Sequence, residues 1–267
     1  MNEPIRILSD LHLGHKVSRI GRVSVLRPLL AGMGTVVFNG DTWEEMGQQY
    51  CGHSAAMLEE LRELCAGEGA TAVFLSGNHD PGWPGPGWLE LANGRVIVTH
   101  GDALMHDSSP WKREILNSQQ QVKELWQRFP AANHDPEERV RIAREIACLL
   151  RSAEYPKGRG FIQRAWDAAL PPQRAFMMIH AWCTQGAMGA RFCERYFPQA
   201  EALVVGHLHQ RGCWVSKGRL VINTGSFVSP GRAHCVTWHD GWLARAEIDE
   251  FPDLCRPGRI LGMWRFS

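Results

Sequence analysis

Short apolar segments recur along the chain, and each of them ends in a cluster of polar residues. The segments are rich in β-branched residues and do not alternate with polar ones, which is typical of strands buried on both faces. Strands are predicted in this way at 5–8, 35–38, 72–75, 96–98 and 202–205. A helix with apolar positions at Met57, Leu58, Leu61 and Leu64 lies between the second and third of them. Alternating strands and helices predict an α/β fold in which helices cover the sheet.

The pattern changes after residue 220, where shorter strands follow one another without helices between them. We expect strands at 220–223, 233–238 and 242–248. The sequence His239-Asp240-Gly241 predicts a hairpin turn between the last two strands. These antiparallel strands are expected to complete a second sheet.

A run of helical patterns interrupts the alternation between residues 110 and about 200. Its clearest start is at Asp135, which precedes Pro136 in the first turn and has Glu138 three residues after it. Apolar spacing predicts an earlier helix with Ile115, Val122, Leu125 and Phe129, and a later one with Phe161, Ala165 and Trp166. The chain is therefore predicted to be a single domain, 1–267, with a helical insert at 110–200. The insert is expected either to form a lid or only to cover the sheet.

Composition and charge exclude several classes of protein. The chain has 267 residues, of which 44% are hydrophobic and 21% charged, as in an ordinary globular protein. Its 29 basic and 28 acidic residues give a net charge of +1, so no overall attraction to nucleic acid is expected. The sequence contains no membrane-spanning segment and no signal-peptide profile. Because the eight Cys form no C-x-x-C pair, the expected location is the reducing cytoplasm.

The polar clusters at the strand ends carry the candidate chemistry. In an open α/β sheet, ligands bind beyond the carboxyl ends of strands, so clusters far apart in the sequence are expected to converge. Their carboxylate, amide and imidazole groups suit first-row divalent metals better than Ca²⁺. The candidate metal ligands are Asp10, His12, Asp41, Asn78, His100, His207 and His209. Residues 223–226 are expected to form a turn beneath this site.

Seven donors are too many for one ion that keeps an open coordination position, so two divalent ions are expected. One ion would bind Asp10, His12, Asp41 and His209. The other would bind Asp41, Asn78, His100 and His207, so that Asp41 bridges the two. Ions roughly 3.5–4 Å apart can activate a bridging hydroxide and hold the oxygens of an in-line phosphoryl displacement. Mn²⁺ is the favoured metal, and Zn²⁺ and Fe accept the same donors.

These residues fall in five blocks whose order resembles that of the calcineurin-like metallophosphoesterase family: D-x-H, G-D-x-x-[DE], G-N-H-[DE], H and G-H-x-H. The blocks stand here as Asp10/His12, Gly40 to Glu44, Gly77 to Asp80, His100 and Gly206 to His209. The resemblance covers 5–102 and 202–227 and leaves the helical insert outside. It implies a two-sheet β-sandwich flanked by helices, which hydrolyses a phosphoester or pyrophosphate bond of a phosphorylated small molecule.

The resemblance also implies roles for single residues. It makes the seven donors metal ligands and His79 the non-ligand histidine that protonates the leaving oxygen. Glu44 falls at the acidic position that orients His79, where many relatives have Asp. Apart from the resemblance, Asp80 is expected to cap or hydrogen-bond the loop backbone, and Asp102 is expected either to support His100 or to act directly in catalysis. No residue is expected to bind an organic cofactor.

Further features narrow the resemblance within the family. The sequence Asp10 to Leu13, the His100-Gly101-Asp102 block and Asp107 are similar to the bacterial UDP-2,3-diacylglucosamine pyrophosphatases of lipid A synthesis. Those enzymes also have a helical insert, and their lipid substrate implies peripheral contact with a membrane. They typically carry Arg at the position of His79, so this activity stands as an alternative to a general phosphoesterase.

A nuclease and a non-catalytic scaffold are the remaining alternatives. A nuclease needs Lys and Arg clustered along a groove for the sugar-phosphate backbone. The nearest approach to such a cluster has acidic residues between its members and is predicted to be a solvated helix face. It consists of Arg139, Arg141, Arg144 and Arg151. A scaffold that retained only the fold would have lost His79 or a metal ligand, and all of these are present.

Overall fold

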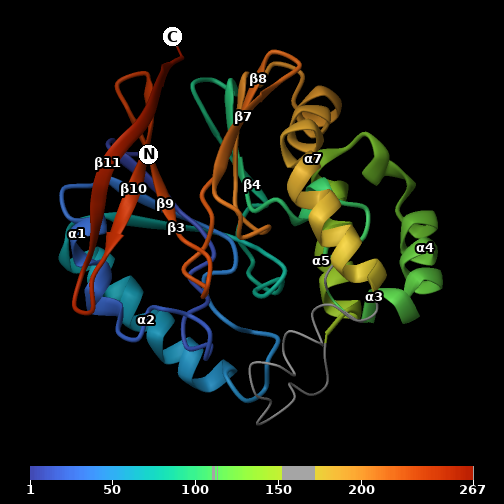
Figure 1. Ribbon diagram of the computed structural model, residues 1–267, viewed down its shortest axis with the longest axis horizontal. Coiled ribbons are helices and arrows are strands. Elements are labelled where there is room, and N and C mark those ends of the chain that lie inside the picture. Colours follow the sequence, from blue (N-terminus) through green and yellow to red (C-terminus); the bar gives the residue numbers. More distant parts are fainter. Residues whose placement is uncertain (110–111, 113, 152–171, 267) are drawn as a thin grey trace.

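The computed structural model describes residues 1–109, 112, 114–151 and 172–266. Its strands form two sheets, one with six strands in the order β11-β10-β9-β1-β2-β3 and one with five in the order β4-β5-β6-β8-β7. Helices lie on the outer sides of the two sheets (Figure 1). This arrangement confirms the predicted α/β class, a two-sheet sandwich flanked by helices.

The first sheet joins a parallel half to an antiparallel half. Strands β1, β2 and β3 are parallel, while β9 pairs antiparallel with β1 and is followed by β10 and β11. The six strands are β1 (Ile5–Leu8), β2 (Thr35–Asn39), β3 (Thr71–Leu75), β9 (His234–His239), β10 (Trp242–Glu250) and β11 (Cys255–Arg265). Strand β11 forms one edge and was not predicted from the sequence.

The second sheet has a parallel centre, β5, β6 and β8, and antiparallel strands at its two edges, β4 and β7. Its strands are β4 (Trp88–Leu91), β5 (Val96–Thr99), β6 (Ala202–Val205), β7 (Gly212–Ser216) and β8 (Arg219–Asn223). The edge strands were not predicted. Because they are only partly buried, they lack the continuous apolar pattern of the central strands.

The expectation that all C-terminal strands complete the second sheet is wrong for two of them. Strand β8 does lie in the second sheet, but β9 and β10 extend the first sheet, where Val236 of β9 pairs with Ile7 of β1. The burial pattern of β9 shows that both its faces are covered, but such a pattern does not specify which sheet a strand joins. The predicted turn is confirmed, since Asp240 and Gly241 have positive φ angles of 47° and 77° between paired strands.

Alternate side chains of the central strands enter different cores. Val36 of β2 packs in the core under the helices of the first sheet, whereas its neighbour Val37 packs between the sheets. Val96 of β5 faces the same central core, and Ile97 faces the outer core of the second sheet with Phe192. Both faces of each central strand are therefore buried, which explains the unbroken apolar runs in the sequence.

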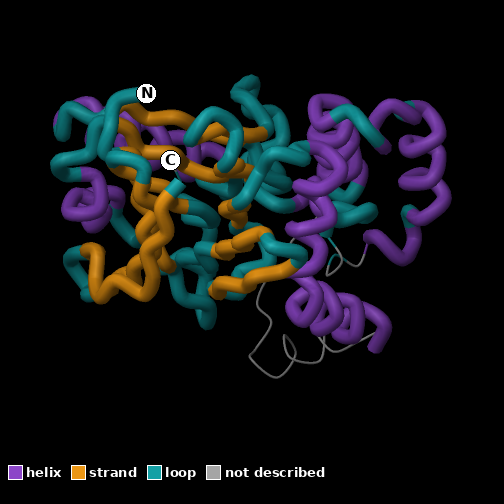
Figure 2. Tube along the Cα trace, turned by 90° about the horizontal axis from the view of Figure 1, so that it is seen from above, coloured by secondary structure: helices purple, strands orange, loops and turns teal. Residues whose placement is uncertain are grey.

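Helices cover the outer face of each sheet. The first sheet is covered by η1 (Val23–Leu26), α1 (Arg27–Leu30) and α2 (Cys51–Gly67), and the second by α7 (Pro172–Tyr196). The view from above places the helices that follow β5 together at one end of the molecule (Figure 2). None of the described helices combines the length and apolar composition needed to cross a bilayer.

Much of the insert packs around a small core of its own. After the short η2 (Asp102–Leu104), the insert contains α3 (Glu114–Asn117), α4 (Gln119–Arg128), η3 (Pro130–Asn133) and α5 (Pro136–Leu149). The buried side chains of this small core are Ile115, Val122, Ala132, Ile142, Ile146 and Leu150. The single helix predicted over Ile115–Phe129 is divided at Ser118 into α3 and α4. The helix predicted around Phe161–Trp166 lies outside the described residues.

Helix α5 presents its arginines differently from the predicted solvated face. Arg139 is buried and donates to the carbonyl of Met105, and Arg144 donates to Ser76 Oγ at 2.8 Å. Arg151, just after the helix, donates to a main-chain carbonyl. Arg141 is exposed and pairs with an acidic residue one turn away. The prediction is therefore wrong for three of the four arginines, because loops that are distant in sequence pack against this side of the helix.

The predicted start of α5 is confirmed. Asp135 has an extended backbone, and its Oδ1 accepts hydrogen bonds from the main-chain N–H groups of Glu137 and Glu138 at 2.8 and 3.2 Å. These groups lie in the first turn, where they have no carbonyl partner within the helix.

Replacement of this cap tests how much α5 depends on it. We expect Asp135→Ala to lower the free energy of unfolding by about 1 kcal/mol, since two first-turn N–H groups lose their acceptor. Asp135→Asn retains an acceptor oxygen and should lose less. Urea unfolding followed by circular dichroism measures both variants. Equal stability of Asp135→Ala and the unmodified chain would contradict this role of the cap.

Candidate metal centre

The ends of the central strands meet at one edge of the two sheets. The carboxyl ends of β1, β2, β3, β5 and β6 are followed by Asp10, Asp41, Asn78, His100 and His207. Main-chain hydrogen bonds join these loops, from Asp10 N to Gly40 O at 3.1 Å and from Gly206 N to His100 O at 2.8 Å. The predicted convergence of the polar clusters is thus present in the structure.

One group of donors consists of Asp10, His12, Asp41 and His209, whose ligand atoms lie within 4.8 Å of one another. The Nε2 atoms of His12 and His209 face each other at 3.3 Å. His12 Nε2 is 3.5 Å from Asp41 Oδ2, and His209 Nε2 is 3.2 Å from Asp10 Oδ1. These are the four residues predicted for the first ion.

A second group consists of Asp41, His100 and His207. His100 Nε2 lies 3.2 Å from His207 Nδ1 and 3.4 Å from Asp41 Oδ1. The amide oxygen of Asn78 is 3.3 Å from His100 Nε2, so the fourth predicted residue borders the same space. Asp41 belongs to both groups and directs Oδ2 to the first and Oδ1 to the second. This is the orientation required of a bridging carboxylate.

The distances and charges of both groups fit divalent cations. Two ligands about 2.0–2.1 Å from one ion lie about 3–3.4 Å apart in tetrahedral or octahedral geometry. The facing imidazole nitrogens, at 3.2 and 3.3 Å, match this spacing. The carboxylates of Asp10 and Asp41 are at most 1% exposed, and within the described residues their ion-pair partners are all histidines. Such buried charge is costly unless it is paired or coordinates a metal.

Main-chain carbonyls orient two of the imidazoles. His100 Nδ1 donates to the carbonyl of Asn39 at 3.0 Å, which leaves Nε2 as the atom that can bind a metal. His207 Nε2 donates to the carbonyl of Ser108 at 2.6 Å and leaves Nδ1 as the ligand atom. Hydrogen bonds of this kind fix the tautomer of a metal-binding histidine. Asn39 and Ser108 were not predicted, since a carbonyl acceptor leaves no trace in the residue type.

The backbone around the donors is unusual. Several donors have left-handed conformations with φ between 46° and 66°, which Asp and His tolerate better than most side chains. They are Asp10, His12, Asp41, His207 and His209. Gly77 is required for a different reason, because a Cβ at this position would collide with Asp41 Oδ1 and the ring of His100. The glycines of the G-N and G-H pairs therefore make room for buried carboxylates.

Two further aspartates stand close to the donors. Asp80 accepts hydrogen bonds from the main-chain N–H groups of Gly77, Asp41 and Thr42, as predicted for a residue that holds the loop. Asp102 accepts from the N–H of Ala103 instead of supporting His100 by a hydrogen bond. The carbonyl of Asn39 already occupies His100 Nδ1, but the charge of Asp102 adds to the rise in the pKa of His100, so Asp102 supports this residue electrostatically.

Residues 223–226 lie beneath the donors, as predicted, but they continue β8 with Asn223 and an isolated bridge between Gly225 and Ala233 and do not form the predicted turn. The side chain of Asn223 donates to Gly206 O at 2.8 Å and to Gln185 Oε1 of α7 at 2.9 Å. Thr224 Oγ1 is 2.5 Å from the hydroxyl of Ser9, which precedes Asp10. Hydrogen bonds from β8 and α7 thus hold the loops that carry Asp10 and His207. The contribution of Gln185 was missed, since a single polar residue in a helix gives no distinctive signal.

His79 and Glu44 form a hydrogen-bonded pair next to the first group. His79 Nδ1 lies 2.7 Å from Glu44 Oε2, and the Glu44 side chain is fully buried while that of His79 is 17% exposed. Ser54 Oγ accepts from the main-chain N–H of Glu44 at 2.7 Å, and the N–H of His79 donates to Asp41 Oδ1 at 2.8 Å. His12, Glu44 and His79 also form a third possible ligand group.

Burial and neighbouring charges shift the pKa values of the site in opposite directions. Burial and the His79 ring hold the pKa of His12 well below its usual value, and burial and His100 do the same for His207. Burial also acts to lower the pKa of His100, but the Asp41 carboxylate prevails and raises it well above the usual value. For His79, the carboxylates of Glu44 and Asp41 likewise outweigh burial and raise the pKa.

The buried carboxyl groups show the same competition. Burial acts to raise the pKa of Asp41, yet the rings of His100 and His79 hold it well below its usual value. Burial raises the pKa of Asp80 to about 7, and the nearby Asp41 carboxylate adds to this rise. Asp41 is therefore ionised at neutral pH.

No protein-family model matches the sequence, and no curated protein matches it. Among solved structures, the chain is similar to a predicted phosphoesterase from Streptococcus pneumoniae TIGR4, with 14% identity, a TM-score of 0.38 and coverage of 97% of this chain and 98% of that one. A dimetal phosphatase from Danio rerio has 11% identity, a TM-score of 0.47 and coverage of 99% and 100%. A Vps29 single mutant from Entamoeba histolytica has 12% identity, a TM-score of 0.46 and coverage of 99% of this chain and 100% of that one. At these identities the candidate residues are assigned by their own geometry alone.

The shared position of Asp41 predicts a particular effect on metal binding. We expect Asp41→Asn to weaken binding at both groups by at least about tenfold, since each loses its ionised oxygen. His209→Gln should weaken binding at the first group only. Elemental analysis and calorimetric titration with Mn²⁺ measure both variants. Two tightly bound metals per chain in Asp41→Asn would refute the bridging role.

Proposed function

We propose that this chain is a metal-dependent phosphoesterase that hydrolyses a phosphoester or pyrophosphate bond of a small molecule. The observation that carries the proposal is the buried Asp41 carboxylate, which directs one oxygen to each of two donor groups. Divalent ions bound there would supply an activated water molecule and neutralise charge on the phosphoryl oxygens. Mn²⁺ is our proposal for the metal, with Zn²⁺ and Fe as alternatives.

The seven donors divide between the two ions as their geometry suggests. Their mixed oxygen and nitrogen atoms exclude no first-row metal, while the absence of Cys among them argues against a structural zinc–thiolate site. The proposed ligands of the first ion are Asp10, His12, Asp41 and His209. Those of the second are Asp41, Asn78, His100 and His207.

His79 is the proposed general acid. Its Nδ1 is held by the buried carboxylate of Glu44, which leaves Nε2 to donate a proton to the leaving oxygen. Glu44 keeps the ring oriented and favours its protonated form, as the raised pKa of His79 indicates. Glu has one methylene more than Asp, and the 2.7 Å contact supports the idea that it still reaches the ring. Glu44 is thus a positioning residue, and His79 the catalytic one.

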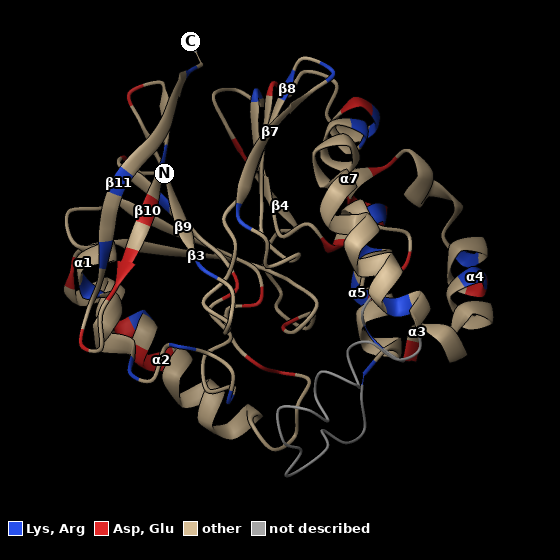
Figure 3. Cartoon of the chain, viewed as in Figure 1, with Lys and Arg blue, Asp and Glu red and all other residues tan. Residues whose placement is uncertain are grey.

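A nuclease is not favoured by the distribution of charge. Lys and Arg are interspersed with Asp and Glu over the described chain (Figure 3). Arg139, Arg144 and Arg151 donate to protein carbonyls or a hydroxyl, so they do not form the free basic stripe that a nucleic-acid backbone requires. We infer that the substrate is a small molecule.

The helical insert at 110–200 is proposed to influence substrate choice within a single domain. It begins after β5 and His100, close to the donors, whereas its end at residue 200 leads into the amino end of β6, where Glu201 N donates to Arg95 O at the opposite edge of the sheet. Helix α7 covers the outer face of the second sheet, whereas α3, α4 and α5 surround a separate core. We therefore propose that α7 serves to cover the second sheet. The helices α3, α4 and α5 are proposed to contact parts of the substrate that are distant from the reacting bond.

The proposed location is the cytoplasm. All eight Cys are free thiols, which is in keeping with a reducing compartment. Peripheral contact with a membrane would follow only if the substrate is a lipid. UDP-2,3-diacylglucosamine is the alternative substrate of that kind, suggested by the sequence resemblance.

The general-acid role of His79 predicts a dependence on the leaving group. We expect His79→Ala to lower kcat by about 10²–10⁴-fold for a poor leaving group, because the leaving oxygen loses its proton donor. The loss should shrink for nitrophenyl esters, whose leaving group needs little protonation. Glu44→Gln should show a smaller loss with the same dependence on the leaving group, and His53→Ala on the surface of α2 serves as the control. An equal loss for all leaving groups would argue against proton donation.

The proposed reaction class predicts metal-dependent hydrolysis in a substrate panel. After treatment with a chelator, we expect the protein to be inactive and Mn²⁺ to restore hydrolysis. The panel contains aryl phosphomonoesters, aryl phosphodiesters, nucleotide-sugar pyrophosphates and single-stranded DNA, and release of phosphate or product is measured. Activity confined to DNA would favour a nuclease. A protein that binds metals fully but hydrolyses nothing in the panel, with Mn²⁺, Zn²⁺ or Fe²⁺, would favour a scaffold.

A further inference from the structure

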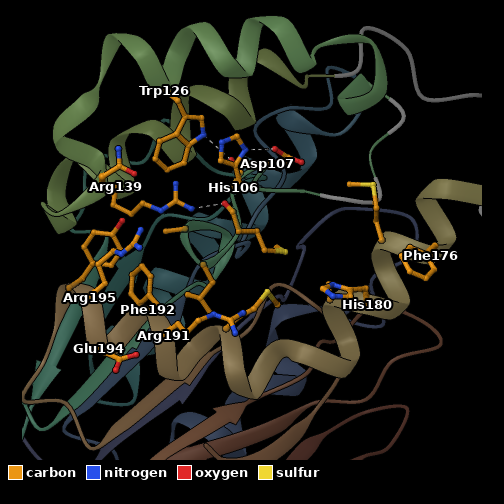
Figure 4. Close-up of a pocket in the computed structure, with 18 residues that line it drawn as sticks. His106, Asp107, Trp126, Arg139, Phe176, His180, Arg191, Phe192, Glu194 and Arg195 are labelled. Carbon is orange, nitrogen blue, oxygen red and sulfur yellow. Dashed lines mark hydrogen bonds and ion pairs between the residues drawn. The ribbon is translucent and has the colours of Figure 1, made fainter. Parts of the chain in front are cut away.

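Within the insert, a cavity of about 1110 Å³ lies between α4 and α5 on one side and α7 on the other (Figure 4). Its walls come from the segment 103–107 after β5 and from α4, α5 and α7. The volume is slightly above the usual range for small-molecule sites, about 300–1,000 Å³. None of its lining residues is a candidate metal ligand or belongs to the His79–Glu44 pair.

A thin layer of side chains separates this cavity from the candidate metal centre. Met105 and Ala181, which line the cavity, pack with Leu208, the residue between His207 and His209. The indole N–H of Trp182 donates to the carbonyl of Leu208 at 2.9 Å. The cavity thus lies behind the loop that carries two candidate ligands and is a distinct space.

Apolar side chains supply much of the cavity wall. Leu104 and Met105 lie on the side of the loop, and Met177, Met188 and Phe192 on the side of α7. Methionine side chains are flexible and adapt to ligands of irregular shape. Phe176 also lines the cavity and is 71% exposed, which places an apolar residue at a point accessible from solvent. These walls suit an alkyl body better than a polar sugar.

Arg139 introduces a buried cation into this apolar surrounding. The residue is 4% exposed, its Nη2 donates to the carbonyl of Met105 at 2.6 Å, and its guanidinium stacks on Trp126 at 4.6 Å. Within the described chain, its buried Nη1 has no hydrogen-bond partner and its side chain has no ion pair. Burial lowers the pKa of Arg139 to about 10, so it remains a cation at neutral pH. A buried cation is stabilised by an anion that pairs with it.

The remaining charges around the cavity leave an excess of positive charge. Arg191 and Arg195 of α7 line it together with Arg139. The two carboxylates in the lining already have partners, since Asp107 Oδ1 lies 2.6 Å from His106 Nδ1 and Glu194 Oε2 lies 2.6 Å from Nζ of a lysine outside the cavity. A ligand that brings its own negative charge would balance the guanidinium groups.

We propose that this cavity binds an anionic amphiphile, with a carboxylate or phosphate head at Arg139 and an alkyl body along the Met and Phe walls. The two kinds of head share the same chemistry, because either offers oxygens to a guanidinium group. The inference goes beyond the proposed hydrolase and does not depend on it. Binding can be measured in the presence of chelator, where no hydrolysis takes place, so failure of either proposal is distinguishable.

Calorimetric titration of the full chain with monomeric dodecanoate, in the presence of chelator, tests the proposal. We expect saturable binding at one site, and dodecyl phosphate should bind to the same site in competition. Inorganic phosphate and the uncharged 1-dodecanol should each bind at least about tenfold more weakly, since each lacks one half of the ligand. Phosphate that binds as tightly as dodecanoate would show a free-anion site, and dodecanol that does so would show a purely apolar one. Either result overturns the proposal.

Variants locate the binding site. Arg139→Gln should weaken dodecanoate binding at least about tenfold through loss of the charged hydrogen bond. Met177→Trp, on the partly exposed side of α7, should fill the cavity and weaken binding even if Arg139→Gln does not fold. Arg141→Gln, two residues further along α5 and outside the cavity, is the matched control and should bind as the unmodified chain does. Unchanged affinity in folded Met177→Trp, checked by circular dichroism, would place the amphiphile elsewhere and refute the proposal.

Discussion

The buried carboxylate of Asp41 is the constraint around which the candidate centre is arranged. It is 1% exposed, faces His12 with one oxygen and His100 with the other, and accepts the main-chain N–H of His79. An ion removed from water in this way costs several kcal/mol unless opposite charge and hydrogen bonds compensate it. This compensation comes from the surrounding imidazoles and the proposed cations. Gly77, which has no Cβ, leaves room for the carboxylate. The same carboxylate thus links the fold of the loops to the chemistry of the site.

The sandwich places the donors around Asp41 through the direction of its strands. Strands β1, β2 and β3 are parallel in one sheet and β5, β6 and β8 in the other, so that polar loops from both sheets meet at one edge. Asn39 joins the two sheets at this point. Its side chain donates to Thr99 O at 2.9 Å, and its carbonyl accepts from His100. Relative movement of the sheets would break both hydrogen bonds and displace a candidate ligand.

The helical insert both covers the second sheet and lines the large cavity. Helix α7 buries the outer face of the second sheet and also forms one wall of the large cavity. Arg139 of α5 reaches from the insert to the carbonyl of Met105, and a few residues later the carbonyl of Ser108 holds His207. The segment 100–109 therefore contributes His100 and the carbonyl of Ser108 to the candidate metal centre, and its residues 103–107 line the cavity. Its position explains why the candidate metal centre and the cavity lie close together without sharing a residue.

The sequence by itself determined the features that depend on local signals. Buried strands were recognised by their apolar runs, the start of α5 by Asp135, and the β9–β10 turn by Asp240-Gly241. The grouping of polar residues at strand ends predicted the seven donors, because the carboxyl ends of parallel strands converge in any such sheet. The proposed roles of His79 and Glu44 came from the family resemblance and not from these patterns.

Only the tertiary structure decided the features that depend on residues distant in the chain. It placed β9 and β10 in the first sheet, since a pattern of buried faces does not choose a neighbouring strand. It assigned the support of His100 to the carbonyl of Asn39, since every residue carries a carbonyl and its use is invisible in the sequence. It turned Arg139 inward, although the acidic residues beside it suggested a solvated face. Burial, hydrogen-bond partners and cavities are properties of packed surfaces, and packing is settled only when the whole chain has folded.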